Sequence, residues 1–179
     1  MNVSSADLSL SFGAYIKPTS DPDLYDSGSI RLLLEFADSM TDGTGADQID
    51  FVYADSGSLI GDADADYDLY GSLSDVFGAT INAARIKGIF FKNTSSTAAV
   101  INVGGGTDGA GTAAFDSWIT STAADGSEAV IVRAGGGFML YAPDATAYVV
   151  TNTSADTLSL LETASLAATY ELYLIGATS

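Results

Sequence analysis

Runs in which hydrophobic and polar residues alternate follow one another along most of the 179-residue chain. Alternation with a period of two predicts a β-strand with one buried face, because successive side chains of a strand point to opposite sides of a sheet. The runs recur about every 8–12 residues with turn-forming residues between them, a spacing typical of a β-sandwich or barrel. They are DLSLSF (7–12), SIRLLLEF (29–36), IDFVYA (49–54), YDLYGSL (67–73), INAARIKGIFF (81–91), AAVINV (98–103), EAVIVR (128–133), GFMLYA (137–142), TAYVVT (146–151), TLSLL (157–161) and TYELYLIG (169–176).

Patterning with the period of a helix is weak by comparison. In GTAAFDSWITS, Phe115, Trp118 and Ile119 would share one side of about two helical turns. Turn signals are stronger: TDGTG (41–45) and TDGAG (107–111) each contain an Asp-Gly pair, which suits backbone positions with positive φ. We therefore predict an all-β chain.

A glycine-rich stretch after the predicted strand AAVINV matches the G-x-G-x-x-G pattern of dinucleotide-binding loops, at Gly104, Gly106 and Gly109. Such a loop holds a pyrophosphate where it opens a helix in a βαβ unit, because the amide groups of the helix then face the phosphates. Here Gly111 follows closely and more predicted strands come next. We interpret the stretch as a turn and expect no cofactor.

The net charge of the chain and the residue types that it lacks exclude several classes of function. The chain has 23 acidic and 6 basic residues and a net charge of −17, so neither nucleic acid nor an anionic membrane is an expected partner. It has no histidine and no cysteine, which excludes Ser-His-Asp and Cys-His catalytic groups. No coherent acid pair for glycosidase chemistry can be recognised among so many aspartates. We do not expect an enzyme, and we predict no catalytic residues.

The first residues lack the positive start and the apolar core of a signal peptide. No apolar run approaches the ~18 residues needed to span a bilayer as a helix. We expect the protein to be made and used in an aqueous compartment, without export by the usual route.

The stretch GDADADYDLYG (61–71) places Asp62, Asp64 and Asp66 two residues apart, so that in a strand they line one face. D-x-D-x-D begins an EF-hand calcium loop, but Tyr67 and Leu73 occupy the positions where that loop needs Gly and Glu. Two interpretations stay open: a loose Ca²⁺ site, or a solvated acidic edge that discourages aggregation between sheets. We favour the acidic edge.

Two of the six basic residues, Arg85 and Lys87, lie close together in a predicted strand. They share one face of that strand, and Ile89 and Phe91 fall on the same face unless Gly88 introduces a bulge. One interpretation is a basic face that pairs with nearby aspartates. The other is a docking face for an acidic partner, where apolar residues beside charges suit the rim of an interface.

From about residue 28 onward the order of phrases resembles a group of small structural proteins of tailed bacteriophages. That group shares a D-L-x-G-x-L-x-D-x-F-G stretch, a strand ending in a V-K-x-I-like tetrad, a P-G-G-F-like turn and a closing strand that runs into I-G-x-S. The corresponding phrases here are DLYGSLSDVFG (68–78), IKGI (86–89), AGGGF (134–138), which lacks the proline, and IGATS (175–179). The resemblance implies a β-sandwich with a structural role in the virion and supplies no catalytic residues.

Residues 1–27 fall outside this resemblance. Pro18 and Pro22 lack an amide donor and disfavour regular strand pairing in this segment. It nevertheless carries more apolar residues than a purely solvated tail needs, at Phe12, Tyr15, Ile16, Leu24 and Tyr25. We predict an extended arm that reaches a neighbouring subunit or the capsid lattice through these residues. The alternative is an arm that packs along its own sandwich.

We therefore expect a single antiparallel β-sandwich, jelly-roll-like, at residues 28–179, with an N-terminal arm at 1–27. The expected function is that of a decoration or cement protein, which binds the outside of an assembled phage head and stabilises it. Its expected partners are the major capsid protein and further copies of itself, as a trimer. The expected location is the capsid surface, after synthesis in the cytoplasm of the host bacterium. The alternative is a host-recognition module of the tail or its fibres.

Overall fold

The computed structural model describes residues 6–16, 30–104, 113–119 and 128–179; for 6–16 and 30–38 it describes the backbone alone. Every regular element in these ranges is a β-strand, which confirms the predicted all-β class. The strands are β1 (Ala6–Ile16), β2 (Ile30–Asp42), β3 (Gln48–Ile49), β4 (Phe51–Ile60), β5 (Asp64–Asp68), β6 (Tyr70–Ser74), β7 (Thr80–Asn82), β8 (Arg85–Asn93), β9 (Val100–Gly104), β10 (Ala129–Arg133), β11 (Gly137–Tyr141), β12 (Tyr148–Val149), β13 (Thr157–Glu162) and β14 (Ala167–Ala177).

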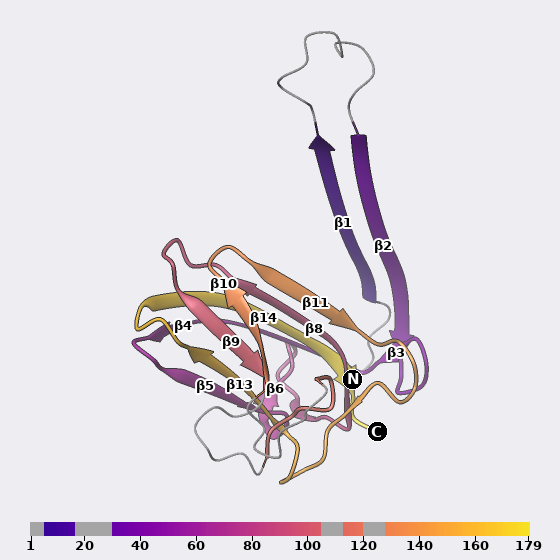
Figure 1. The fold of residues 1–179 in the computed structure, drawn as a ribbon. Helices are drawn as coiled ribbons and strands as arrows, with labels where there is room; N and C mark the ends of the chain where they lie inside the picture. Colours follow the sequence, from indigo (N-terminus) through magenta and orange to yellow (C-terminus); the bar gives the residue numbers. More distant parts are fainter. Residues whose placement is uncertain (1–5, 17–29, 105–112, 120–127) are drawn as a thin grey trace.

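Two antiparallel sheets pack face to face and form a sandwich (Figure 1). The first has the order β11-β8-β14-β4, with the short β12 also paired to β8. The second has the order β10-β9-β13-β5. The strands β4 and β5 therefore lie at the edges of their sheets.

The eight long strands of the sandwich pair in a nested order along the chain. The first pairs with the eighth (β4 with β14) and the second with the seventh (β5 with β13). The third pairs with the sixth (β8 with β11) and the fourth with the fifth (β9 with β10). Successive pairs alternate between the two sheets, and β8–β14 and β9–β13 contacts complete each sheet.

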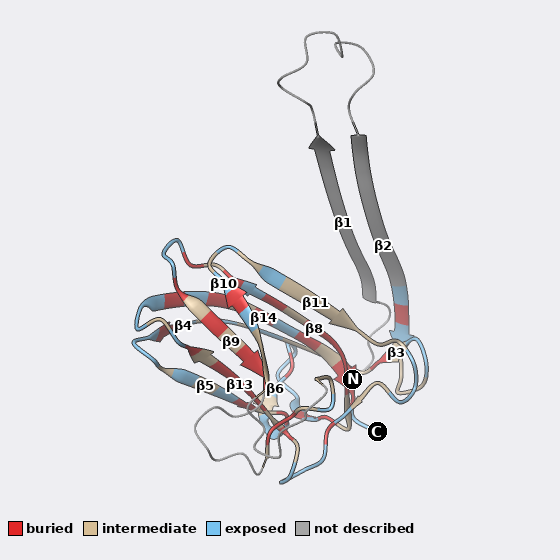
Figure 2. Ribbon diagram, viewed as in Figure 1, coloured by how far each residue is buried: buried red, intermediate tan, exposed pale blue. Residues whose placement is uncertain are grey.

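Alternating residues from both sheets form the core, as the period-two pattern predicts. On β14, Tyr170, Leu172 and Leu174 are buried, whereas Tyr173 points outward and is 45% exposed. The opposite sheet contributes Ile101 and Leu160, both fully buried. Figure 2 shows buried residues along the strands of both sheets and exposed residues at many of the turns between them.

A two-stranded ribbon, formed by β1 and β2, projects away from the sandwich (Figure 1). The predicted arm at 1–27 thus contributes one strand, whose partner begins at Ile30. The other end of β2 pairs in parallel with β3 through Thr41 and Asp42. The boundary predicted between residues 27 and 28 stays a prediction.

Residues 113–119, where the sequence shows weak helical patterning, contain an isolated bridge and a turn. Ala114 bridges to Thr157, and Phe115 is fully buried in the core. Trp118 stacks on Phe138 with ring centroids 5.8 Å apart. Phe115 and Trp118 therefore pack in and against the core of the sandwich and do not form one side of a helix.

Candidate interaction surface

A short turn between β6 and β7 displays two neighbouring apolar side chains to solvent. In this turn, residues 75–79 and hereafter the Phe77 turn, Val76 is 53% and Phe77 63% exposed. The other strongly exposed large hydrophobic residues among those described, such as Ile60 and Ile131, stand alone along the chain. Adjacent exposed apolar residues are the more informative signal of a binding surface.

The backbone of the Phe77 turn is held by the side chain of Asp75. The Oδ1 atom of Asp75, a residue only 8% exposed, accepts hydrogen bonds from Phe77 N at 2.9 Å and Ala79 N at 2.8 Å. Asp75 N donates to Ala79 O, and Gly78 N donates to Asp75 O.

Two further features fix the turn. Gly78 has φ +88°, a conformation that residues with a Cβ rarely adopt. Val76 N donates to Val52 O at 3.0 Å and fastens the turn to the edge strand β4. The turn is therefore fixed before any partner arrives.

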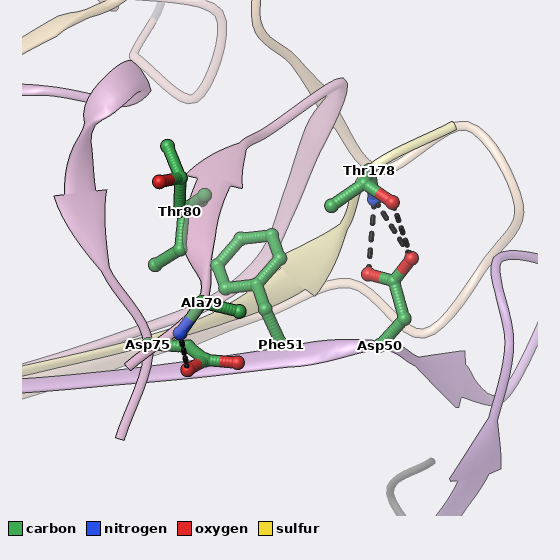
Figure 3. Close-up of a pocket in the computed structure, with 7 residues that line it drawn as sticks. Asp50, Phe51, Asp75, Ala79, Thr80 and Thr178 are labelled. Atoms are coloured by element: carbon green, nitrogen blue, oxygen red, sulfur yellow. Dashed lines mark hydrogen bonds between the residues drawn. The ribbon is translucent and has the colours of Figure 1, made fainter. Parts of the chain in front are cut away.

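A small cleft lies beside the Phe77 turn. It has a volume of about 170 Å³ and is lined by Asp50, Phe51, Asp75, Ala79, Thr80, Ile81 and Thr178 (Figure 3). Asp50 closes one side, where its carboxylate accepts hydrogen bonds from the backbone N–H and the hydroxyl of Thr178. Both aspartates of the cleft thus accept hydrogen bonds from groups of the chain itself.

The base of the ribbon reaches the same region of the sandwich. Ile49 of β3 is fully buried and directly precedes Asp50, which lines the cleft. At the end of β2, Met40 is 1% exposed. Asp47 N donates to Pro143 O at 2.8 Å, and Lys87 Nζ donates to Gly45 O, so the loop after β2 is tied to the sandwich at two points.

The predicted face of Arg85, Lys87, Ile89 and Phe91 does not form an outward surface, and that expectation is wrong. Ile89 is fully buried and Phe91 is 3% exposed, both within the hydrophobic core. The reason is a β-bulge: β14 pairs with Ile86 and then with Gly88, so Lys87 is the extra residue. The extra residue shifts the alternation and lets Ile86 and Ile89 both face the core.

Lys87 itself is fully buried, whereas Arg85 is partly exposed. Burial, with the nearby Arg85 charge as a second cause, lowers the pKa of Lys87. The guanidinium of Arg85 donates to Ala145 O. The two basic residues thus hold loops in place, and of the predicted face Arg85 alone is partly open to solvent.

The arm residues predicted to contact a partner divide between two places in the chain. Phe12, Tyr15 and Ile16 belong to β1, where Phe12 pairs with Leu34 and Ile16 with Ile30. Leu24 and Tyr25 lie outside the described residues. Contact of this segment with a partner stays a prediction.

The aspartates of the candidate Ca²⁺ site occupy the edge strand β5 and the turn before it. Asp64 and Asp66 are exposed and alternate with the half-buried Ala65 and the buried Tyr67, as the pattern predicts. Asp62 accepts from the N–H and hydroxyl of Ser165, and Asp66 accepts from the hydroxyl of Ser159. In the described part of the chain, no three His, Cys, Asp or Glu side chains gather where they could hold a metal ion.

Of the predicted glycine turn, the described residues include Gly104, the last residue of β9. A Cβ at Gly104 would lie 2.3 Å from Glu128 O, so the glycine allows β10 to approach. The rest of the pattern, from residue 105 to 109, lies outside the described residues.

One buried carboxylate has a structural explanation. Glu162 is fully buried at the turn between β13 and β14 and accepts from the backbone N–H groups of Ala164, Leu166 and Asp62. Burial alone would raise its pKa, but these donors outweigh that effect and lower the pKa of Glu162. The carboxylate therefore organises a turn.

Sequence reasoning missed the Phe77 turn as a display of apolar residues. The available signal was the D-L-x-G-x-L-x-D-x-F-G stretch, which contains Asp75, Phe77 and Gly78. Phe77 follows Asp75 and precedes Gly78, two turn-forming residue types, whereas phenylalanine normally enters the core.

No helix in the described residues has the length and apolar character to cross a membrane. Comparison of the chain with protein families, with curated proteins and with solved structures gives no match.

Proposed function

We propose that this chain is a structural protein of a bacteriophage particle, a decoration or cement protein that binds the outer surface of the assembled capsid and stabilises it. The order of phrases along residues 28–179 supports a virion protein by resemblance. The sandwich supports it as well, because its exposed turns offer binding surfaces.

We further propose that the sandwich is a jelly roll. In that architecture eight strands form two sheets and two Greek keys. The support is the nested pairing of the eight strands. The first strand pairs with the eighth, the second with the seventh, the third with the sixth and the fourth with the fifth, and successive pairs lie in alternate sheets.

The main support for a binding role is the Phe77 turn. Its two apolar side chains are exposed in the free chain, yet the backbone that displays them is locked by Asp75. A rigid apolar anchor loses little conformational entropy on binding, and burial of a phenylalanine in a partner's pocket contributes about 1.5–3 kcal/mol. Anchors of this kind dominate the affinity of protein interfaces.

Attachment of such a protein stabilises a shell by mass action. A ligand that binds the assembled state and not the dissociated state shifts the equilibrium towards assembly. The net charge of −17 adds a preference for basic surfaces on the shell.

Co-sedimentation with purified phage heads that lack this protein tests the proposal. The wild-type chain is expected to pellet with heads, and Phe77→Ala to bind at least about tenfold more weakly, the effect of losing one buried aromatic anchor. The matched control is Ile131→Ala. It shortens a side chain that is 64% exposed on β10, in the sheet β10-β9-β13-β5.

The control is expected to bind as the wild type does, and all three chains to unfold at the same temperature. Equal binding by Phe77→Ala and the wild type would show that Phe77 does not anchor the protein to the head. No binding of the wild type to heads would overturn the proposed function and leave the tail- or fibre-associated module as the better candidate.

A further inference from the structure

The ribbon of β1 and β2 has two faces of opposite character. Its strands pair at eleven consecutive positions, from Ala6 opposite Met40 to Ile16 opposite Ile30. Residues directly opposite each other in an antiparallel pair share a face, and so does every second residue along a strand. The register therefore assigns every ribbon residue up to Met40 to one of two faces.

One face is almost entirely apolar. It holds Ala6, Leu8, Leu10, Phe12, Ala14, Ile16, Ile30, Leu32, Leu34, Phe36 and Met40, with Asp38 the one charged residue. The other face holds Asp7, Ser9, Ser11, Gly13, Tyr15, Arg31, Leu33, Glu35, Ala37 and Ser39. At the base, where side chains are described, the faces differ as expected: Met40 is buried and Ser39 is exposed.

The apolar face needs a cover that the ribbon's own sandwich does not supply along its length. A two-stranded ribbon alone is marginally stable in water, and an apolar face requires a third strand or a packing partner. The third strand, β3, reaches Thr41 and Asp42 at the base of the ribbon. Beyond the base, the ribbon extends away from the sandwich (Figure 1).

We propose that the cover is the same face of a second copy of this chain, so that copies associate ribbon to ribbon. A suitable partner must be apolar over the full ribbon, about 36 Å for eleven residues at a rise of about 3.3 Å. Another ribbon meets this requirement in length and in character. The face offers one charge near its base and none farther out, so nothing along it selects a basic partner.

The size of the contact and the charge of the chain agree with this occupant. Two strands about 4.8 Å apart give a face about 10 Å wide, so two such faces bury a total approaching ~1,000 Å² once side-chain relief is included, near the lower limit for a specific interface. Chains with a net charge of −17 repel each other. The ribbon projects away from the sandwich (Figure 1), so the apolar contact lies away from the charges that the sandwich carries, and salt screens charges separated by more than ~8 Å.

The test uses the purified full-length chain without any capsid, so its outcome is independent of the proposed function. Sedimentation velocity at micromolar concentration is expected to give a defined oligomer. Leu10→Glu, in the middle of the apolar face, is expected to give monomers. The matched control is Ser11→Glu, which adds the same charge at the next residue on the other face and is expected to leave the oligomer intact. Trp118 fluorescence checks that the sandwich of each variant is folded.

A second measurement keeps the test decisive if Leu10→Glu disturbs folding. The chain has no cysteine, so single cysteines report contacts between copies. Phe12→Cys is expected to form disulfide-linked dimers on mild oxidation, and Ser11→Cys is expected to form few. A monomeric wild-type chain, or equal crosslinking at the two positions, would overturn the proposal.

Discussion

The phenolic oxygens of Tyr67 and Tyr170 lie 2.6 Å apart and form a hydrogen bond between the two sheets. Tyr67 belongs to β5 and Tyr170 to β14, and both are about 5% exposed. Tyr67 also donates to Asp55 Oδ2 at 2.6 Å, so the proton on the Tyr170 oxygen is the one shared between the phenols. The bond from Tyr67 to Asp55 joins the edge strands β5 and β4 directly, and the bond to Tyr170 adds β14.

Removal of the two hydroxyls is expected to have unequal effects on stability. Tyr67→Phe loses both hydrogen bonds and leaves Asp55 and Tyr170 without this partner, which should lower the free energy of unfolding by about 1–3 kcal/mol. Tyr170→Phe keeps the bond from Tyr67 to Asp55 and should cost less. Chemical denaturation measures both, with Tyr173→Phe at an exposed position of β14 as the control. Equal losses for the two variants would contradict a chain of hydrogen bonds that runs from Tyr170 through Tyr67 to Asp55.

The same cluster predicts loss of stability at alkaline pH. Burial, together with the nearby Asp55 charge, raises the pKa of Tyr53 to about 12, and burial also raises the pKa of Tyr67 and of Tyr170. Above pH ~10, the ordinary pKa of tyrosine, the unfolded chain loses phenolic protons that the folded chain keeps. The free energy of unfolding should therefore fall as the pH rises from about 10 towards 12.

Denaturation at a series of pH values, with tyrosinate absorbance recorded in parallel, checks this trend. Tyr67→Phe removes one of the raised phenols and should show a shallower fall. A free energy of unfolding that stays constant up to pH ~12 would show that the phenols are not held in their protonated form.

Asp75 is expected to affect partner binding although its side chain is buried. Asp75→Ala removes the acceptor for Phe77 N and Ala79 N, so the turn loses its fixed shape. Binding to phage heads should weaken as it does for Phe77→Ala, and stability should fall by about 1–2 kcal/mol. Asp75→Asn keeps one acceptor oxygen and should restore most of both losses. Normal head binding by Asp75→Ala would mean that the fixed turn is irrelevant to docking.

The sequence predicted the strands well where one face is buried. The alternation in TYELYLIG corresponds to β14, with Tyr170, Leu172 and Leu174 buried as expected. The acidic edge was also predictable, because the aspartates of β5 alternate with Ala65 and Tyr67. Both patterns depend on residues near each other in the chain.

The features that sequence reasoning missed depend on distant pairing. The sequence allowed for a bulge at Gly88, but its occurrence at Lys87 is set where β8 pairs with Ile175 and Gly176 of β14, about ninety residues away. The apolar face of the ribbon was partly visible in DLSLSF, but the register with β2 was needed to give it a second strand. The outward display of Phe77 depends on the hydrogen bonds that Phe77 N donates to Asp75 and Val76 N donates to Val52, while its residue type pointed to the core.

The most direct test of the structural role is the copy number of this chain in purified phage particles, measured by quantitative mass spectrometry against the major capsid protein. A decoration protein is expected in numbers comparable with those of the capsid subunits, and its removal should lower the temperature at which heads open. A few copies per particle, or none, would contradict the proposed role.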